Sequence, residues 1–407
     1  MENRYDKYKD SGIAWIGEIP EHWEITSFKR KITINNGKDY KDFLDAEIYP
    51  VMGSGGCFAY CSNYMHDGEA LLLGRKGTID KPLYVKGKFW AVDTMFYAIP
   101  HANLDCKFAY YLALMFPFNL YSTSTSLPSL TQTDLGNILV AFPFLSEQQS
   151  IATYLDQKCG ELDELITMQE EMITKLQSYK QSVITEAVTK GLDKNVPLKD
   201  SGIEWIGNTP EHWNKNKIIR LFGIIGSGTT PKSSKEDNYI GSVNWIQSGD
   251  INGGYIESCK NTISDTALKE YTTLKIYKAP FIIVAMYGAS VGNISISNID
   301  GCVNQACCVM NETKQNFKYL FYAMNSVKKY LIYKAEGGGQ PNISQDKIKN
   351  TWLPIPPLSE QQSIANYLDQ KCSEIDELIS IKQQKIEKLK DYKKSLIFEC
   401  VTGKRKV

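Results

Sequence analysis

The sequence predicts an α+β fold in which two mixed α/β globules alternate with two long antiparallel helices. We expect the helices to pair with each other as an intramolecular coiled coil, which gives the chain a pseudo-two-fold repeat. Two observations support this fold: a pair of segments that occurs twice, and two stretches of helical periodicity. The expected domains are a globule at residues 1–142, a central helix at 143–190, a second globule at 191–355 and a C-terminal helix at 356–407.

Length and composition agree with a folded protein of several domains. The chain has 407 residues, of which 43% are hydrophobic and 23% charged. These are ordinary values for globular proteins and argue against a mainly disordered chain. The first residues, MENRYDKYKD, contain no apolar run, and no uninterrupted apolar stretch of about 18 residues follows. We therefore expect a cytoplasmic protein.

The repeat consists of two segments that recur in the same order. KDSGIAWIGEIPEHW at residues 9–23 returns as KDSGIEWIGNTPEHW at 199–213, with 12 of 15 positions identical. LSEQQSIATYLDQKC at 145–159 returns as LSEQQSIANYLDQKC at 358–372, with 14 of 15 identical. Such close copies indicate one scaffold that the chain uses twice.

The stretches between the repeated segments differ from each other. Residues 24–142 and 214–355 share only sparse matches, such as LPSLTQ at 127–132 with QPNISQ at 340–345. The second stretch is also 23 residues longer, because the two repeats have offsets of 190 and 213. Two divergent inserts on near-identical supports predict one scaffold that presents two different surfaces.

Each SEQQ segment opens a predicted helix. Ser146 to Gln149 and Ser359 to Gln362 have the composition of a capping box, which satisfies the first backbone amides of a helix. Gly191 and Gly403 follow the last apolar residues, so each helix has about 44 residues and a length of about 65 Å. The expected coiled-coil seam comprises Leu155, Leu162, Leu165, Ile166, Met172, Ile173, Leu176, Tyr179 and Val183 in the first helix and Leu368, Ile375, Leu378, Ile379, Ile386, Leu389, Tyr392 and Leu396 in the second.

Neither helix can bury such a stripe alone. An internal partner is available, because the repeat supplies a second helix of matching pattern. The alternative is that each stripe packs only on its own globule. Gln169 and Lys382 occupy the same position in the two stripes and are candidates for fixing the register.

The inserts contain both strand and helix patterns. Short apolar runs bounded by turn residues, ALLLG at 70–74 and FIIVAMYG at 281–288, predict strands. KFAYYLALMF at 107–116 and FKYLFYAMNSVKKYLIY at 317–333 have helical length and periodicity. We expect the tryptophans of the WIG and PEHW segments to pack at the base of each globule.

Sequence motifs for catalysis or metal binding are few. Neither a GxxxxGK[ST] loop nor a GxGxxG loop after a strand is present, which argues against nucleotide hydrolysis and dinucleotide binding. The ten cysteines have irregular spacing, so we expect reduced thiols. Cys57, Cys61 and His66 form a weak zinc-ligand pattern without a second pair to complete four ligands. A nuclease hypothesis rests on Glu312-Thr313-Lys314 with Asp300 as a ligand of Mg²⁺.

Charge is distributed unevenly. Residues 214–357 carry 16 Lys and Arg against 10 Asp and Glu, whereas residues 24–142 carry 11 of each. Residues 144–190 are acidic, with 4 basic and 8 acidic side chains. A positive second globule suits contact with phosphate groups, although a solvated surface explains the same charge.

Glycine-rich polar loops supply candidates for contacting DNA bases. In such loops, Arg or Lys can bond guanine and Gln or Asn can bond adenine. Any turn-rich α/β protein has loops of this kind, so each loop alone is weak evidence. The candidates are Lys38, Tyr40, Lys41, Arg75, Lys76, Thr78 and Gln132 in the first globule and Ser227, Thr229, Thr230, Lys232, Gln247, Ser248, Tyr287, Ser290, Gln340, Asn342 and Ser344 in the second.

With both repeats in view, the chain resembles the specificity subunit of type I restriction-modification systems over essentially its full length. The resemblance rests on SGIxWIGxxPEHW at the start of each half, on LSEQQxIAxYLDQKC with DELI following at 163–166 and 376–379, and on GGGQPNIS at 337–344. It departs from a strict tandem pattern in one place, since LPSLTQ replaces the glycine-rich segment in the first half.

The resemblance implies a non-catalytic DNA-binding subunit with two target-recognition domains, each reading one half of a split, asymmetric target. Partners would be double-stranded DNA, two methyltransferase subunits and restriction subunits, with no membrane. Cofactors would sit in the partners, S-adenosylmethionine in the methyltransferase and ATP with Mg²⁺ in the restriction subunit, and none in this chain. The rival hypotheses are the nuclease described above and a purely structural coiled-coil assembly protein.

Overall fold

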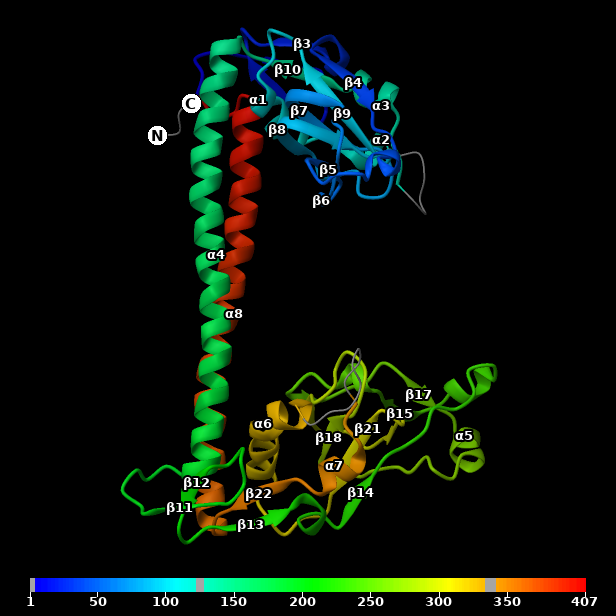
Figure 1. Cartoon of the computed structure of the whole chain (residues 1–407), viewed down its shortest axis with the longest axis vertical. Coiled ribbons are helices and arrows are strands. Elements are labelled where there is room, and N and C mark those ends of the chain that lie inside the picture. The colour runs from blue at the N-terminus through cyan, green and yellow to red at the C-terminus, as the bar shows by residue number, and fades with distance from the viewer. Residues whose placement is uncertain (1–3, 122–127, 334–341) are drawn as a thin grey trace. The chain divides into compact units, whose positions relative to one another are not determined.

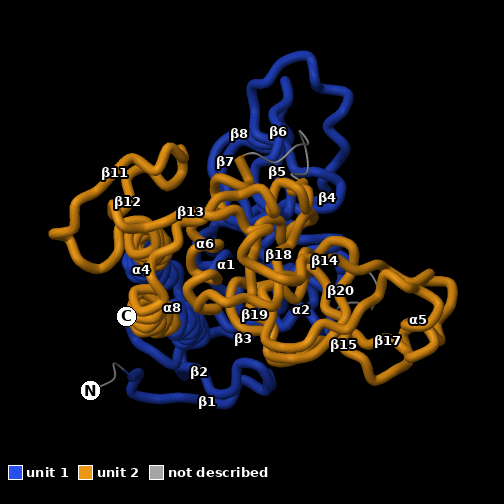
Figure 2. The backbone as a smooth tube through the Cα atoms, turned by 90° about the horizontal axis from the view of Figure 1, so that it is seen from below, with its two compact units in different colours: residues 1–171, 382–407 blue, residues 172–381 orange. Residues whose placement is uncertain are grey.

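The computed structural model describes residues 4–121, 128–333 and 342–407. It divides into two compact units, one of residues 1–171 with 382–407 and one of residues 172–381 (Figure 2). Each unit consists of one globule and one part of each of two long helices. The predicted α+β fold class, with its repeat of globule and long helix, is confirmed.

The globule of the first unit is built on a six-stranded sheet (Figure 1). The strand order is β4–β9–β7–β8–β5–β6, and all neighbours are antiparallel except β5 with β8. Both faces of the sheet are covered, since Leu71 and Leu73 of β7 pack with the helix α1 while Leu72 packs in a cluster on the other face. The strands are β4 (Ile32–Asn36), β5 (Tyr49–Gly53), β6 (Gly56–Cys61), β7 (His66–Gly74), β8 (Leu83–Ala91) and β9 (Met95–Pro100).

Shorter elements complete this globule. β1 pairs antiparallel with β2 within the entry segment, and β3 pairs antiparallel with β10, which joins the entry of the insert to its exit. Their bounds, with those of the helices, are β1 (Tyr8–Asp10), β2 (Glu18–Pro20), β3 (Glu24–Ser27), β10 (Leu139–Phe142), η1 (Phe28–Arg30), η2 (Lys41–Phe43), α1 (Cys106–Ala113), α2 (Phe118–Tyr121) and α3 (Gln132–Asn137). The predicted strand at 70–74 and helix at 107–116 are therefore confirmed.

The globule of the second unit has a five-stranded sheet, β14–β21–β18–β19–β16, and a three-stranded sheet, β17–β15–β20. The strands are β14 (Ile224–Gly226), β15 (Val243–Ile246), β16 (Tyr255–Ile256), β17 (Thr262–Ile263), β18 (Phe281–Ala285), β19 (Ile294–Ser297), β20 (Cys302–Val303) and β21 (Cys307–Asn311). Around them lie β11 (Leu198–Asp200), β12 (Asn208–Pro210), β13 (Asn214–Lys217), β22 (Trp352–Ile355), η3 (Ile218–Arg220), η4 (Glu236–Tyr239), η5 (Ser248–Asp250), α5 (Asp265–Glu270), α6 (Phe317–Tyr333) and α7 (Gln345–Lys349).

The two globules share a common centre despite their divergent sequences. Antiparallel neighbours β4–β9–β7 in the first correspond to β14–β21–β18 in the second. The short pair β3 with β10 corresponds to β13 with β22. The two inserts therefore pair these strands in the same order, although their sequences match only sparsely.

The long helices are α4 (Leu145–Lys190) and α8 (Leu358–Val401), of 46 and 44 residues. In the first unit, Asp163 of α4 accepts from Lys393 of α8 at 2.7 Å. In the second, Lys180 of α4 donates to Asp376 of α8 at 2.7 and 2.6 Å. The residue numbers of both pairs add up to 556, so the helices run antiparallel in one common register. The predicted helix pairing is confirmed.

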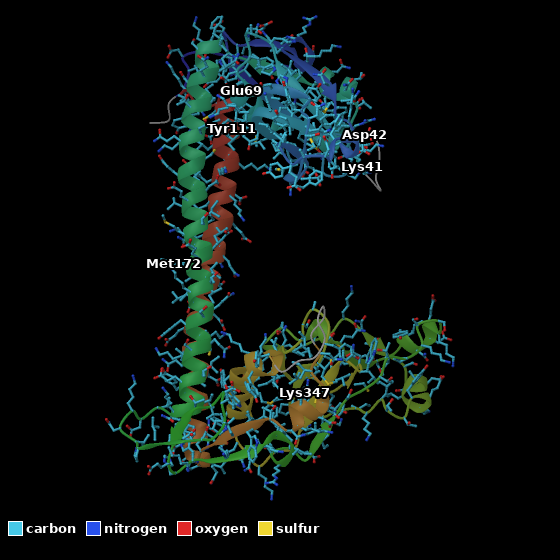
Figure 3. The ribbon with its side chains drawn as sticks, in the orientation of Figure 1. Lys41, Asp42, Glu69, Tyr111, Met172 and Lys347 are labelled. Atoms are coloured by element: carbon cyan, nitrogen blue, oxygen red, sulfur yellow. The ribbon has the colours of Figure 1, made fainter. Side chains whose placement is uncertain are left out.

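The buried seam is narrower than the predicted stripe. Ile151, Leu155, Cys159 and Leu162 are buried, and in the second unit Ile364, Leu368, Cys372 and Ile375 are buried at the same repeat positions. Five residues assigned to the seam are instead 42–57% exposed, namely Leu165, Met172, Tyr179, Leu378 and Tyr392 (Met172 is labelled in Figure 3). A pair of helices buries only one narrow face of each, so a wider apolar stripe leaves side chains in solvent.

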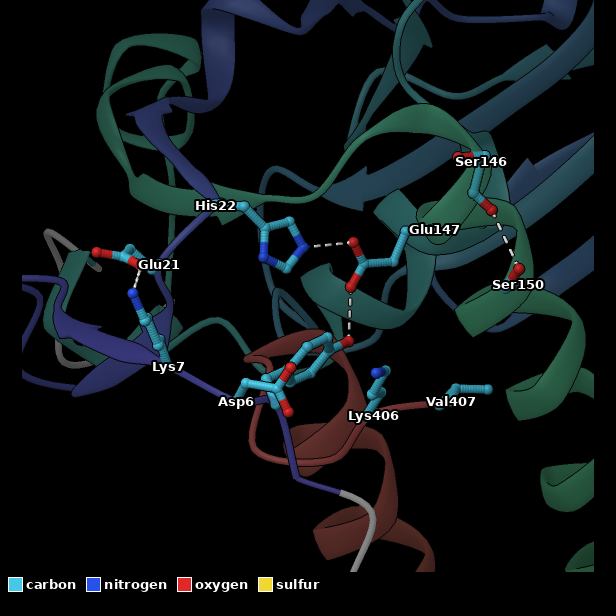
Figure 4. A pocket seen from close by; sticks show the side chains of 10 residues that line it. Asp6, Lys7, Glu21, His22, Ser146, Glu147, Ser150, Lys406 and Val407 are labelled. Carbon is cyan, nitrogen blue, oxygen red and sulfur yellow. Dashed lines mark hydrogen bonds and ion pairs between the residues drawn. The ribbon is translucent and has the colours of Figure 1, made fainter.

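Glutamates near the start of each long helix fasten it to the entry segment of a globule. The Glu147 carboxylate accepts from Trp23 Nε1 at 3.2 Å and from Tyr5 Oη at 2.6 Å. It also lies 2.8 Å from His22 Nε2 (Figure 4). Glu360 makes the same contacts with Trp213 Nε1 at 2.9 Å and His212 Nε2 at 2.7 Å. We call each set a glutamate anchor.

The glutamate anchors correct the capping-box prediction. The helices begin at Leu145 and Leu358, one residue before Ser146 and Ser359, so these serines lie inside the first turn. The glutamates point to the tryptophan and histidine of PEHW, because an indole N–H at the edge of a buried ring needs an acceptor. Trp23 and Trp213 of PEHW are almost fully buried, as predicted for the base of each globule, whereas Trp15 and Trp205 of WIG are half-buried.

Three further predictions from the sequence concern the cysteines, a zinc site and membrane-spanning helices. The ten cysteines are free thiols. Within residues 4–121, 128–333 and 342–407, no three His, Cys, Asp or Glu side chains come together as a metal site, so the zinc pattern of Cys57, Cys61 and His66 does not form one. Over the same ranges, every helix is too short or too polar to cross a bilayer.

Candidate nucleic-acid interface

Four segments of the first globule meet around the turn Val92–Thr94. The backbone N–H of Lys38 donates to Ala91 O at 2.9 Å, and that of Arg75 donates to Thr94 O at 2.9 Å. Leu130 N donates to Arg75 O at 3.0 Å, which brings the segment before α3 to the same place. We call residues 37–41, 74–78, 92–94 and 128–132 the first reading loops. The structure thus brings all the first globule's predicted residues onto neighbouring segments.

Three of the exposed side chains of the first reading loops are lysines. Lys38, Lys41, Lys76 and Thr78 are exposed. Lys41 forms an ion pair with Asp39 at 3.3 Å, and hydrogen bonds from the Lys41 and Tyr40 amides help to lower the pKa of the Asp39 carboxyl. Ammonium groups on solvent-exposed loops can reach phosphate oxygens without losing buried contacts.

Three other predicted residues of these loops are engaged inside the protein. Arg75 donates from Nη1 to Asp93 O at 3.3 Å and stacks its guanidinium 5.8 Å from the Phe96 ring centre. Gln132 Nε2 donates to Ile34 O at 3.1 Å. The half-buried Tyr40 ring packs edge-on against Phe58, with 5.8 Å between ring centres. These contacts hold the loops in one arrangement.

The second globule gathers its predicted residues around the corresponding turn, Val303–Gln305. Thr230 Oγ1 donates to Gln305 Oε1 at 2.5 Å, and Asn304 N donates to Ile246 O at 3.2 Å. Met286 N donates to Ala306 O at 2.7 Å, and Ile343 N donates to Met286 O at 2.7 Å. We call residues 227–232, 246–250, 286–290, 303–305 and 342–344 the second reading loops.

The second reading loops present neutral polar groups for the most part. Thr230, Lys232 and Asn342 are exposed, while Ser227, Thr229, Gln247, Ser248, Tyr287 and Ser290 are half-buried. Burial raises the pKa of Tyr287, which keeps its hydroxyl protonated as a donor. Ser344 caps α7 by accepting from Lys347 N at 3.2 Å. Gln340 lies outside the described residues.

A glycine at the same place in each globule lets the first loop approach the central turn. A Cβ on Gly37 would lie 2.0 Å from Val92 O, and a Cβ on Gly228 would lie 1.7 Å from Val303 O. Both distances are far below contact, so only glycine fits at either position. The two sets of reading loops are therefore one backbone frame with different side chains.

The described parts of LPSLTQ and QPNISQ, residues 128–132 and 342–345, also occupy equivalent places in this frame. Leu130 N bonds Arg75 O as Ile343 N bonds Met286 O, and Thr131 caps α3 as Ser344 caps α7. The sparse sequence match between these segments therefore marks a true correspondence between the globules.

Sequence reasoning missed the central turns themselves. Asp93 and Thr94 in the first globule and Asn304 and Gln305 in the second stand where the other loops meet. Each pair lies in a turn just before a strand. The two turn sequences, VDT at 92–94 and VNQ at 303–305, share only the valine. The close approach of Gly37 and Gly228 to these turns identifies them, but this approach can be seen only in the structure and not in the sequence.

Charge at the reading loops runs against the charge of the whole inserts. The first insert is neutral overall, yet its loops carry Lys38, Lys41, Arg75 and Lys76 against Asp39 and Asp93. The basic second insert has Lys232 as the basic side chain of its described reading loops. The excess positive charge predicted to favour phosphate contact is therefore spread over other parts of the second globule.

The nuclease hypothesis finds no support in the geometry. The Asp300 carboxylate is occupied by Lys278 Nζ at 2.7 Å and by Ala279 N at 2.8 Å, and these bonds lower its pKa. Among the described residues, Asp300 and Glu312 belong to no cluster of three metal ligands.

Comparison with known proteins accounts for the repeat. The family described as "Type I restriction modification DNA specificity domain" matches residues 20–177 and again residues 210–391. The chain belongs to this family. It is therefore a specificity subunit that recognises DNA sequence and is not itself catalytic, as the resemblance implied.

Several relatives match over almost the whole chain. The type I restriction enzyme MjaVIII specificity subunit of Methanocaldococcus jannaschii is 25% identical, covering 96% of this chain and 94% of the relative. The EcoDI specificity subunit of Escherichia coli is 20% identical over 95% of this chain and 89% of the relative. A chain in a solved structure on complex assembly and conformational transition of the type I R-M system has the same fold, with a TM-score of 0.72, 16% identity and 94% and 98% coverage.

Proposed function

We propose that the chain recognises a bipartite, asymmetric DNA target, with each globule contacting one half, and that it brings methyltransferase and restriction subunits to that target. The observation that carries this proposal is the shared frame of the reading loops. Gly37 and Gly228 hold the same approach to the central turn, while the side chains around them differ. One frame with two sets of side chains suits two different half-sites.

Exposed apolar side chains on the long helices supply surfaces for two partner copies. Leu165 is 42% exposed and its repeat equivalent Leu378 is 47% exposed, and Tyr392 and Tyr179 are 52% and 57% exposed. All four are identical between the two copies of the helix, although solvent exposure removes the packing reason for keeping them. We assign these positions to two methyltransferase subunits, one per repeat.

Polar contacts beside these residues are duplicated as well. Lys158 pairs with Glu161 at 2.7 Å, and Lys371 pairs with Glu374 at 2.8 Å. On this proposal the cofactors belong to the partners, S-adenosylmethionine to the methyltransferase and ATP with Mg²⁺ to the restriction subunit. The complex would act on double-stranded DNA in the cytoplasm.

The test is to express the chain with its methyltransferase partner and to map methylated adenines across the host genome. We expect methylation at a single target made of two defined segments with a fixed gap. A continuous target, or no methylation beyond the host background, would overturn the proposal.

The same material separates the rival functions. A structural coiled-coil protein predicts no sequence-dependent DNA binding even after the partners are added. A nuclease acting through Asp300, Glu312 and Lys314 predicts plasmid cleavage by the purified chain with Mg²⁺ alone. The proposed function predicts target-specific binding by the complex and no cleavage by the chain.

A further inference from the structure

One aspartate of each long helix holds a short helix of the neighbouring globule at two points. Tyr111 Oη of α1 donates to Asp156 Oδ1 at 2.8 Å, and Lys107 Nζ donates to Asp156 Oδ2. In the second unit, Tyr322 Oη of α6 donates to Asp369 Oδ1 at 2.8 Å, and Lys318 Nζ donates to Asp369 Oδ2. We call each set an aspartate clamp. Lysine and tyrosine are four residues apart in both helices, so they project from one face.

A buried glutamine completes the attachment of each short helix. Gln148 is 2% exposed and accepts from Asp105 N at 2.8 Å, at the start of α1. Gln361 is fully buried and accepts from Asn316 N at 2.8 Å, at the start of α6. In both long helices the glutamine precedes the aspartate by eight residues, which is about 12 Å along the axis. Two attachment points this far apart fix the direction of the short helix.

The clamps are the same in the two units although their globule partners lie in the divergent inserts. Lys107 and Tyr111 belong to KFAYY, and Lys318 and Tyr322 belong to KYLFY. The charged and hydroxyl donors remain while the residues between them differ. The clamp residues are therefore identical in the two units. In the reading loops, by contrast, the backbone arrangement is shared and the side chains differ.

The strength of the clamp contacts does not explain why they are kept. The side chains of Lys107 and Asp156 are 42% and 37% exposed, and a pair this accessible contributes about 0–1 kcal/mol to stability. Tyr111 is nearly buried, and burial and then the Asp156 hydrogen bond raise its pKa, which keeps it a donor. A two-point attachment fixes the direction of the short helix, and this explains the presence of the clamp in both units better than a contribution to stability does.

The clamp is also remote from the predicted DNA contacts. Figure 3 shows Tyr111 beside α4, whereas Lys41 lies on the side of the same globule that faces away from the helix. We propose that the clamps at Asp156 and Asp369 are positioning residues that fix the direction in which each globule presents its reading loops, so that each clamp governs discrimination in one half of the target. This inference rests on the proposed function.

The experiment compares methylation by complexes carrying wild-type chain, Asp156→Asn or Asp369→Asn on plasmids with the full target, with a mismatch in either half, or with a gap one base pair longer or shorter. Asp156→Asn should raise methylation of mismatched targets about tenfold or more in one half only. Asp369→Asn should do the same in the other half. Asp156→Glu, which keeps the carboxylate, should restore part of the discrimination.

Two further variants control for general damage. Asp163→Asn removes an aspartate seven residues further along α4 that pairs with Lys393 rather than with the globule, and it should leave discrimination unchanged. Tyr111→Phe removes one clamp contact at constant size and should give an intermediate effect in the same half as Asp156→Asn.

Several outcomes would overturn the inference. These are equal loss of methylation at all targets, relaxed discrimination in both halves from one substitution, or unchanged discrimination with a lowered melting temperature. Absence of two-part methylation by the wild-type complex would instead refute the proposed function, so the two failures are distinguishable.

Discussion

The reading loops and the attachments of the globules to the long helices differ in what the two halves of the chain have in common. The reading loops keep their backbone frame through Gly37 and Gly228 while their side chains change, from four basic residues in the first set to one in the second. The attachments keep their side chains, as in the anchors at Glu147 and Glu360. Attachment chemistry is thus separate from recognition chemistry. A chain organised in this way can exchange what it recognises without rebuilding how the recognising part is held.

Lengthening both long helices should have the largest effect. Inserting seven residues after Glu171 and seven after Gln384 preserves the heptad pattern and adds about 10.5 Å to the pair. At 3.4 Å per base pair, the gap of the target should grow by about three base pairs. Methylome sequencing should show loss of the original target and both half-sites unchanged.

The control for this variant is the same insertion in α4 alone. It shifts one helix against the other and unpairs Lys180 from Asp376 or Asp163 from Lys393, so the complex should lose methylation rather than change its gap. Unchanged spacing after the double insertion would refute the role of helix length.

A methyl group on the frame glycine of the first reading loops should have the next largest effect. Gly37→Ala places a Cβ against Val92 O, and relief of such overpacking costs about 1–3 kcal/mol. Thermal unfolding should occur at a lower temperature, and methylation should fall for targets that depend on the half read by this globule.

Gly55→Ala provides the matched control in the same globule. A Cβ on Gly55 meets no atom within 4 Å, so both stability and target choice should stay as in the wild type. Equal behaviour of the two alanine variants would show that the close approach at Gly37 does not hold the frame.

The ion pairs between the long helices should have the smallest effect. Asp163 is 59% exposed and Lys393 is 27% exposed, so their pair contributes less than about 1 kcal/mol. A double-mutant cycle with Asp163→Ala and Lys393→Ala, measured by chemical denaturation, should give a coupling energy of this size. The equivalent pair of Lys180 and Asp376 should give the same value, and a coupling above about 2 kcal/mol would contradict this account.

Much of the fold could be predicted because the repeat identifies equivalent positions and helical periodicity is strong over long segments. The bounds of α4 and α8 and the burial of Trp23 and Trp213 follow from these patterns. The capping-box prediction was wrong, since α4 begins at Leu145, before Ser146, and the neighbouring Glu147 contacts residues 124 and 125 positions away in the chain. Periodicity carries no information on such distant partners.

The site was predictable at the level of loops and less so at the level of residues. Glycine-rich polar segments correctly pointed to loops that the structure brings together, but which residues contact bases stays a prediction. Gln305 and Asp93 carry no local signal, because their place at the centre of the loops depends on how β20, β21 and β9 are paired. Leu165 was assigned to the seam because a stripe records apolar character and not which part of it a single partner helix covers.

The most direct measurement is the methylome of a complex in which residues 24–142 are replaced by the corresponding insert of another specificity subunit. The repeated segments, the glutamate anchors and the long helices stay as they are. The account predicts that one half of the target changes to that of the donor subunit, while the other half and the gap remain. A change in both halves, or in neither, would contradict it.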